Sequence, residues 1–221
     1  TAIITLLIFL CFTLTQALVV SCFSYLFPNI SYEDLAYGNL GLISIIASTA
    51  GIFLLSAFIK LKDITISSYL NIFMPKINIT LVFVFLSFIF MLIMESISSK
   101  YPYFFESDFA IDSYQNANSL PLFYLGVVLF APFFEEFLFR GFLFKGLEKS
   151  SLGGHGAVFI SSILFAIVHI QYGIPILLLM LLPFSILLGY ARWMSGSLLL
   201  PILIHVLNNL ITCIVTHFEI Y

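Results

Sequence analysis

The amino-acid sequence predicts an all-α protein, a polytopic bundle of about seven transmembrane helices. Apolar residues make up 62% of the 221 positions and charged residues only 9%, and the mean hydropathy is +1.15. Soluble domains carry about 25% charged residues, so this composition is typical of a chain immersed in lipid. Lipid offers the backbone no hydrogen-bond partner, and a helix satisfies its own peptide groups, so we expect helical spans.

Apolar segments of roughly the length needed to cross the hydrocarbon core follow one another along the chain. Their ranges are 2–27, 40–59, 81–97, 121–144, 157–171, 174–191 and 197–216. The first segment is longer than a cleaved signal peptide and lacks its basic start, so we interpret it as a retained span. Residues 60–80 mix lysines with Ile, Leu and Phe, a pattern that fits either an amphipathic segment along the membrane surface or a plain loop.

Charged residues between the spans alternate in sign from one side of the membrane to the other. Because basic loops are retained in the cytoplasm, we predict a cytoplasmic N-terminus and an external C-terminus. A single basic residue, Lys100, falls on the acidic side. The basic set is Lys60, Lys62, Lys76, Lys145, Lys149 and Arg192, and the acidic set is Glu33, Asp34, Glu106, Asp108, Asp112 and Glu219.

Several function classes are disfavoured by what the sequence lacks. The net charge is −3 and no cluster of lysines and arginines is present, which argues against nucleic-acid binding. There is no HExxH motif, with which zinc peptidases place two histidine ligands on one helix face. The three cysteines lie singly in apolar segments, so they indicate no disulfide framework. An aspartyl intramembrane protease needs two aspartates within the membrane, so this class is excluded. All four aspartates lie in predicted loops, namely Asp34, Asp63, Asp108 and Asp112.

Ionisable side chains inside the apolar segments are the strongest functional signal. A charge at the centre of a membrane helix costs from about 3 to more than 10 kcal/mol, so such residues usually line a site or a pathway. Glu135, Glu136 and Arg140 lie in the fourth segment. Residues four apart share a helix face, so Glu136 and Arg140 can form an ion pair while Glu135 points toward another helix. A structural polar cluster that fixes helix packing is the alternative interpretation.

Two later segments carry further polar residues at helical spacing. His169 follows Phe165 by four positions, so the phenyl ring can shield and orient the imidazole. His205 and Asn209 are also four apart. Each pair alone is explained equally well by hydrogen bonding within or between helices. At 1.5 Å per residue these positions lie about 12–18 Å from the basic end of their segments, which predicts one polar chamber near mid-membrane.

A carboxylate, two imidazoles and an amide in one water-containing chamber suit hydrolysis of a peptide bond. Glu135 would take a proton from water, while His169 positions that water or carries the proton to the leaving amine. His205 and Asn209 would donate hydrogen bonds to the oxyanion. Helix phase alone allows the neighbouring glutamate, Glu136, as the base instead. Two histidines and a glutamate can also bind catalytic zinc, which stays open as a second hydrolytic alternative.

The three motifs Glu135-Glu136-x-x-x-Arg140, Phe165-x-x-x-His169 and His205-x-x-x-Asn209 occur in this order on successive segments. In this combination the chain resembles the CAAX protease and bacteriocin-processing family, also called the Abi family, of intramembrane glutamic endopeptidases. The resemblance covers about residues 120–212. We therefore expect one integrated membrane domain with variable N-terminal helices and loops, 1–119, and a catalytic core, 120–221.

The resemblance implies a metal-independent peptidase without a cofactor, in which Glu135 rather than Glu136 activates water. Some members trim prenylated CAAX proteins, and bacterial members are linked to bacteriocin maturation or self-immunity, peptide signals and surface display. A short chain of this kind is typical of prokaryotes, so we expect a plasma-membrane protein acting on a peptide or membrane protein, with or without a prenyl group. The expected catalytic residues are Glu135, Glu136, His169, His205 and Asn209, with Arg140 and Phe165 in structural, orienting roles.

Two classes without peptidase activity stay open at this point. The first is a membrane binding or bacteriocin self-immunity protein that uses the polar cluster as a structural core. The second is a small-solute transporter whose Glu and His residues relay protons. A transporter predicts an inverted repeat, and the sequence contains no such repeat.

Overall fold

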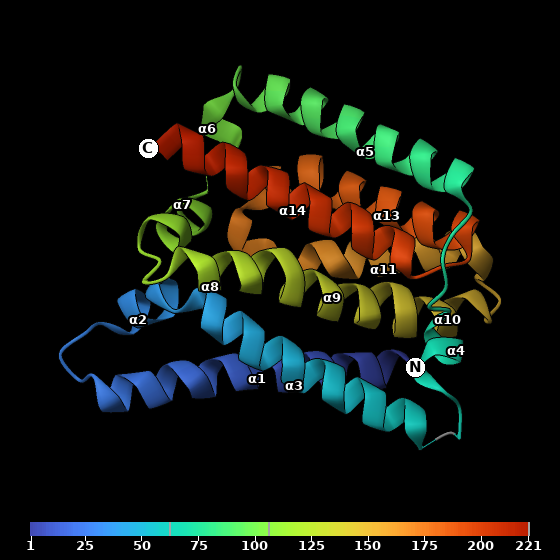
Figure 1. The fold of residues 1–221 in the computed structure, drawn as a ribbon, viewed down its shortest axis with the longest axis horizontal. Coiled ribbons are helices and arrows are strands. Elements are labelled where there is room, and N and C mark those ends of the chain that lie inside the picture. The colour runs from blue at the N-terminus through green and yellow to red at the C-terminus, as the bar shows by residue number, and fades with distance from the viewer. Residues whose placement is uncertain (62, 106, 221) are drawn as a thin grey trace.

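The computed structural model describes residues 1–61, 63–105 and 107–220, without the side chains of residues 219 and 220. The described part is helical and contains no strand, which confirms the predicted fold class (Figure 1). Six of its helices are long and apolar enough to cross a membrane. They are α1 (Ala2–Leu26), α3 (Leu40–Lys60), α5 (Ile77–Ser98), the composite helices Leu120–Glu148 and Ile174–Ser195, and α14 (Leu199–Ile220).

Both composite helices are interrupted by π-helical turns, in which backbone hydrogen bonds reach five residues back. The first contains α8 (Leu120–Tyr124), η1 (Leu125–Phe130), α9 (Ala131–Glu136), η2 (Phe137–Leu143) and α10 (Phe144–Glu148). The second contains α12 (Ile174–Ile176), η4 (Leu177–Leu181) and α13 (Leu182–Ser195). π-helical turns inside α-helices are rare and occur frequently at functional sites.

The predicted span 157–171 is a shorter helix, α11 (Gly153–Ile167), of 15 residues. It is followed by the short 3-10 helix η3 (Ile170–Tyr172) and by Gly173, whose φ of 93° and neighbouring Pro175 separate it from α12. At 1.5 Å per residue α11 extends about 22 Å, so it ends inside the hydrocarbon core. The polar turn after it is thereby placed within the bundle.

The segment between α3 and α5 forms one short helix, α4 (Ile66–Leu70), that docks on the bundle. Leu70 is fully buried and lies against Gly141. Lys145 donates to the carbonyls of Ser68, at 3.3 Å, and of Tyr69. The segment is therefore neither an extended surface helix nor a plain loop, because Leu70 and these hydrogen bonds fix it to the protein.

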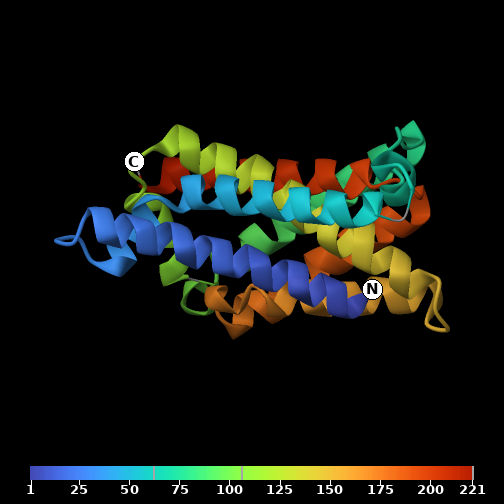
Figure 2. The same ribbon diagram turned by 90° about the horizontal axis from the view of Figure 1, so that it is seen from below.

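The helices are arranged around the composite helix Leu120–Glu148. Helices α1 and α3 lie side by side along one flank, and α5 lies on the other flank against α13 and α14 (Figures 1 and 2). Helix α3 approaches η1 closely, so that a Cβ on Gly126 would lie 2.3 Å from the Gly41 carbonyl oxygen. Small residues at such a crossing let two membrane helices approach backbone to backbone.

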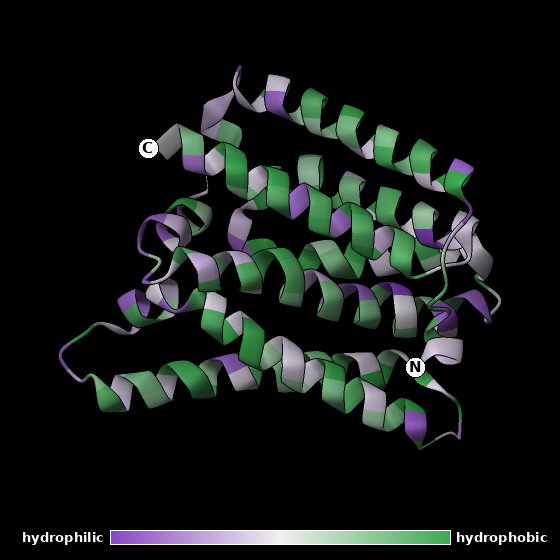
Figure 3. Ribbon diagram, in the orientation of Figure 1, coloured by the Kyte–Doolittle hydropathy of each residue, from purple (hydrophilic) through white to green (hydrophobic). Residues whose placement is uncertain are grey.

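The two ends of the bundle differ in charge, and polar residues also occur in its middle. Figure 3 shows hydrophilic residues at the connecting segments and in the central turns of α9 and α14. The N-terminus, α4 and α10 lie at one end; α2 (Tyr32–Gly38), α6 (Pro102–Phe105), α7 (Asp108–Gln115) and the C-terminus lie at the other (Figure 1). Of the charges used in the sequence pattern, Lys62, Glu106 and the Glu219 side chain lie outside the described residues.

Candidate active site

Three helices bring Glu135, His169 and His205 together in the middle of the bundle. Glu135 lies on α9, His169 follows α11, and His205 lies on α14. The Nε2 atom of His169 is 3.7 Å from Oε1 of Glu135, and the Nε2 atom of His205 is 3.8 Å from Oε2. Both distances exceed a direct hydrogen bond, so a small polar molecule can lie against the carboxylate and an imidazole at once.

The hydrogen bonds of His169 define its tautomer. Its Nδ1 atom lies 2.7 Å from the Phe165 carbonyl oxygen, which can only accept, so the proton is on Nδ1. In a neutral His169 the Nε2 atom that faces Glu135 is therefore an acceptor. Two acceptors cannot bond to each other, but both can accept from one water molecule.

Glu136 fixes the orientation of His205 by bonding to the ring nitrogen that does not face Glu135. Its Nδ1 atom donates to Oε1 of Glu136 at 2.9 Å, and the same oxygen accepts from Nη1 of Arg140 at 3.0 Å. Glu136 and Arg140 are fully buried, and their ion pair is the one that the four-residue spacing predicts. The hydrogen bond to this buried carboxylate fixes the orientation of the His205 ring, whose Nε2 atom faces Glu135.

The guanidinium of Arg140 also reaches the neighbouring helix α13. Its Nη2 atom donates to the carbonyl oxygen of Ser185 at 3.0 Å and to the Ser185 hydroxyl at 2.5 Å. The guanidinium lies 4.4 Å from the ring centre of Phe165, which in turn is 4.6 Å from the ring of His169 and 5.7 Å from that of His205. Phe165 thus packs against the Arg140 guanidinium and against both imidazole rings, and it restricts both rings.

A π-helical turn supplies the partner of Asn209. At the end of η1 the Ala131 N–H bonds to Gly126, five residues back, and Pro132 has no N–H, so the Val127 carbonyl lacks its helical donor. Asn209 Nδ2 donates to this carbonyl at 3.0 Å. The amide is thereby fixed beside the chamber, and its second N–H stays available for another acceptor.

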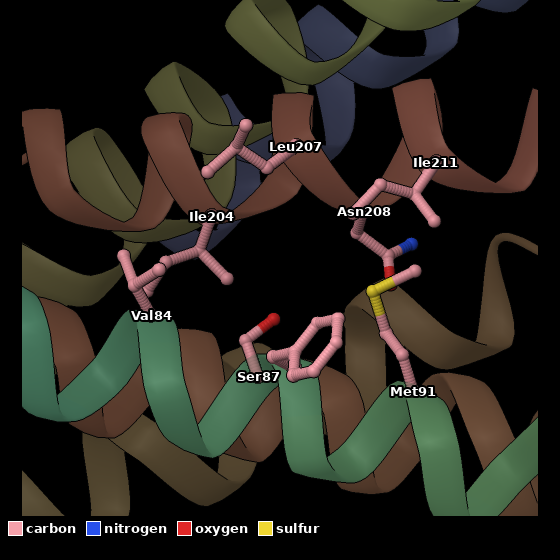
Figure 4. A pocket seen from close by; sticks show the side chains of 8 residues that line it. Val84, Ser87, Met91, Ile204, Leu207, Asn208 and Ile211 are labelled. Carbon is pink, nitrogen blue, oxygen red and sulfur yellow. The ribbon is translucent and has the colours of Figure 1, made fainter. Parts of the chain in front are cut away.

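Asn208 occupies a boundary position between two cavities. It lines the chamber that contains Glu135 and also a small groove of about 60 Å³ between α5 and α14. Figure 4 shows its amide in this groove beside Met91. The side chain donates at 3.4 Å to Oδ1 of Asn209, which further restricts that amide.

The second π-helical turn engages Arg192, a residue that sequence reasoning assigned only to the basic loops. At the end of η2 the Phe144 N–H bonds to Phe139, five residues back. The Arg140 carbonyl instead accepts from Nε of Arg192 at 3.0 Å, and Nη1 of Arg192 donates to the Gly196 carbonyl at 2.6 Å. Arg192 therefore ties α13 to the turn that carries Arg140.

We expect Arg192→Gln to lower the free energy of unfolding by about 1.5–3 kcal/mol, because hydrogen bonds from a charged donor to the buried Arg140 carbonyl and to the partly buried Gly196 carbonyl are lost. The matched control is Lys149→Gln, which removes an exposed positive charge at the same end and is expected to change stability by less than about 0.5 kcal/mol. Thermal unfolding of the purified proteins in detergent measures both. Equal melting temperatures of the two variants would contradict the role given to Arg192.

The chamber in front of Glu135 has a volume of about 500 Å³. Four of the five predicted catalytic residues line it: Glu135, His169, His205 and Asn209. The fifth, Glu136, does not line the chamber and is hydrogen-bonded to His205. Helices α1 and α3 add Thr13, Gln16 and Ser44 to its wall. Sequence reasoning missed these three, although a Gln in the middle of an apolar segment is itself a polar signal.

The arrangement is that of an acid–base centre. In the described part of the chain no three His, Cys, Asp or Glu side chains are arranged to hold a metal ion. One carboxylate faces two imidazoles, and each imidazole has its remote nitrogen bonded to a fixed acceptor. Such a group can move a proton between a water molecule and a substrate nitrogen.

Residues 117–211, which contain all of these motifs, match the family of type II CAAX prenyl endopeptidases described as Rce1-like. This match covers 95 of the 221 residues, and it supports the resemblance of this part of the chain to the CAAX protease and bacteriocin-processing family. No curated protein and no solved structure matches the chain at a significant level. The matched family implies peptidase activity and a peptide or protein substrate in the membrane.

The family match leaves out the first 116 residues. In the structure these residues nonetheless contribute to the chamber, through Phe9 and Gln16 of α1 and Ile43 of α3. The boundary predicted near residue 120 falls close to the start of the match, and the division into variable and catalytic parts stays a prediction.

Proposed function

We propose that the protein is a metal-independent intramembrane endopeptidase that hydrolyses a peptide bond with water activated by Glu135 and His169. The observation that carries the proposal is the position of the Glu135 carboxylate, 3.7 Å and 3.8 Å from the Nε2 atoms of two differently fixed imidazoles. Among the residues that the structure describes, Glu135 is the only carboxylate that lines the chamber. The family match supports the peptidase class.

In the proposed reaction one water molecule donates hydrogen bonds to Glu135 and to Nε2 of His169. Its oxygen attacks the carbonyl carbon of the scissile bond while Glu135 takes the proton. The proton then passes to the amide nitrogen, the carbon–nitrogen bond breaks, and a carboxylic acid and an amine are released. General base assistance of this kind contributes about 10²- to 10⁴-fold to the rate.

The oxyanion formed by this attack needs donors on the other side of the carbonyl. As an imidazolium, His205 would donate from Nε2 to the oxyanion while its Nδ1–H donates to Glu136, and Asn209 would donate the amide hydrogen that Val127 does not use. Each such donor is worth about 3 kcal/mol in the transition state. Glu136 and Arg140 act as positioning residues, because neither lines the chamber.

We place the enzyme in a prokaryotic plasma membrane with its N-terminus in the cytoplasm, in accord with the positive-inside rule. The substrate is a peptide or a membrane protein, and the wall of the chamber fits one extended segment of chain. Its apolar part, which includes Phe9, Phe12 and Leu181, accepts apolar side chains of the substrate.

The test is incubation of the purified, chelator-treated protein in detergent with a quenched library of prenylated and unprenylated peptides. We expect cleavage that survives removal of metal ions, and the cleaved members define the preferred sequence. Activity that disappears on chelation and returns with zinc would support the zinc alternative. A folded protein that cleaves no member would favour the binding or self-immunity alternative.

A further inference from the structure

The basic and acidic ends of the bundle define which end faces the cytoplasm. Five described basic residues outside the buried centre lie at the end that holds the N-terminus, α4 and α10: Lys60, Lys76, Lys145, Lys149 and Arg192 (Figures 1 and 3). At the opposite end, α2 and α7 carry Glu33, Asp34, Asp108 and Asp112, beside Lys100. Lys and Arg are retained on the cytoplasmic side, so the acidic end is external.

The chamber extends from Glu135 toward this acidic end. Its wall includes Ala36 of α2, Phe109 of α7, and Gln171 and Tyr172 of η3. Helices α2 and α7 lie at the acidic end in Figure 1, and Gln171 is exposed. The lining residues therefore lead from the carboxylate to the external surface.

The basic end, in contrast, is closed by packed and hydrogen-bonded segments. None of the residues that line the chamber belongs to α4, to α10 or to residues 192–198. Asn71 Nδ2 donates to the Gly196 carbonyl at 3.2 Å, and the Ser197 hydroxyl donates to the Phe73 carbonyl. Together with Arg192 and Lys145, these bonds fix the segment after α4 across the ends of α10, α13 and α14.

We propose that the substrate is a polypeptide segment that enters the chamber from the external side of the membrane, opposite the cytoplasm. This inference rests on the proposed peptidase function and adds the side from which the substrate is supplied. Glu135 lies 15 residues after Leu120, or about 22 Å along the helix. An extended chain rises about 3.3 Å per residue, so roughly six or seven unfolded residues reach the carboxylate. The substrate is thus an exported peptide or an external segment of a membrane protein.

Cysteine labelling tests the sidedness without any need for activity. In a background with Cys11, Cys22 and Cys213 replaced, Gln171→Cys places a thiol at the mouth and Ser150→Cys places one at the basic end. Both positions are exposed. With a membrane-impermeant maleimide on intact cells, we expect labelling of Gln171→Cys and no labelling of Ser150→Cys until the cells are permeabilised. The reverse pattern, or equal labelling of both in intact cells, would overturn the proposal.

Cleavage in oriented vesicles provides the second test. The probe is a quenched peptide library with sulfonated fluorophores, which does not cross the membrane. We expect cleavage by right-side-out vesicles and its loss in inverted vesicles, and the opposite result would refute external entry. If detergent-solubilised protein also fails to cleave, the peptidase proposal is wrong, while the labelling pattern still decides which side the chamber faces.

Discussion

Replacement of Glu135 by Gln is expected to abolish peptide cleavage while leaving the fold intact. The amide is nearly isosteric with the carboxylate, but it cannot take a proton from water. Because Glu135 is the proposed base, the rate should fall by about 10²- to 10⁴-fold, the range typical of general base catalysis. Single-turnover rates with a peptide identified from the library measure the loss.

The matched control is Glu95→Gln, which removes an exposed carboxylate from another spanning helix, α5. It should cleave at the wild-type rate. Melting temperatures of all three proteins show whether the fold is kept. A Glu135→Gln protein that retains wild-type cleavage would show that another group activates the water. It would favour the alternative that Glu135, Glu136 and Arg140 form a structural polar cluster.

The largest effect on stability is expected from Arg140→Leu. This change leaves Glu136 fully buried without the partner that lies 3.0 Å away, and it also removes the donor to Ser185. Breaking a buried ion pair by removing one partner costs about 3–5 kcal/mol. Unfolding in detergent should therefore occur at a clearly lower temperature or denaturant concentration than for the wild type.

The double variant Glu136→Gln, Arg140→Leu provides the control for this explanation. Removing the carboxylate charge as well takes away the uncompensated buried ion, so part of the lost stability should return. Cleavage should stay low, because His205 loses the carboxylate that orients it. A double variant that is less stable than Arg140→Leu alone would show that the penalty comes from packing and not from the unpaired charge.

The sequence predicted the parts of the site that depend on helical spacing. Residues four apart share a face, and the pair Glu136–Arg140 lies at 3.0 Å while Phe165 and His169 are in ring contact. The membrane class and the family follow from composition and from the order of the motifs, and both are confirmed. Helix phase left the choice of base open, whereas the structure places Glu135 in the chamber wall and Glu136 behind His205.

The contribution of Arg192 was not predictable from side-chain spacing. A lone Arg at the end of a span is ordinary evidence of topology, and its partner here is a backbone carbonyl that a π-helical turn leaves available. Such turns depend on backbone hydrogen bonds that leave little trace in the sequence. Only Pro132, which lacks the N–H that a regular helix would use, gives a signal for the turn η1.

The most direct test of the central claim is cleavage of one defined peptide by metal-depleted protein in water enriched in ¹⁸O. If Glu135 activates water without a metal, the new carboxyl terminus should carry one ¹⁸O atom in the wild-type reaction, and Glu135→Gln should form this product about 10²- to 10⁴-fold more slowly. Product that forms only after zinc is added back, or equal labelled product from Glu135→Gln, would contradict the account.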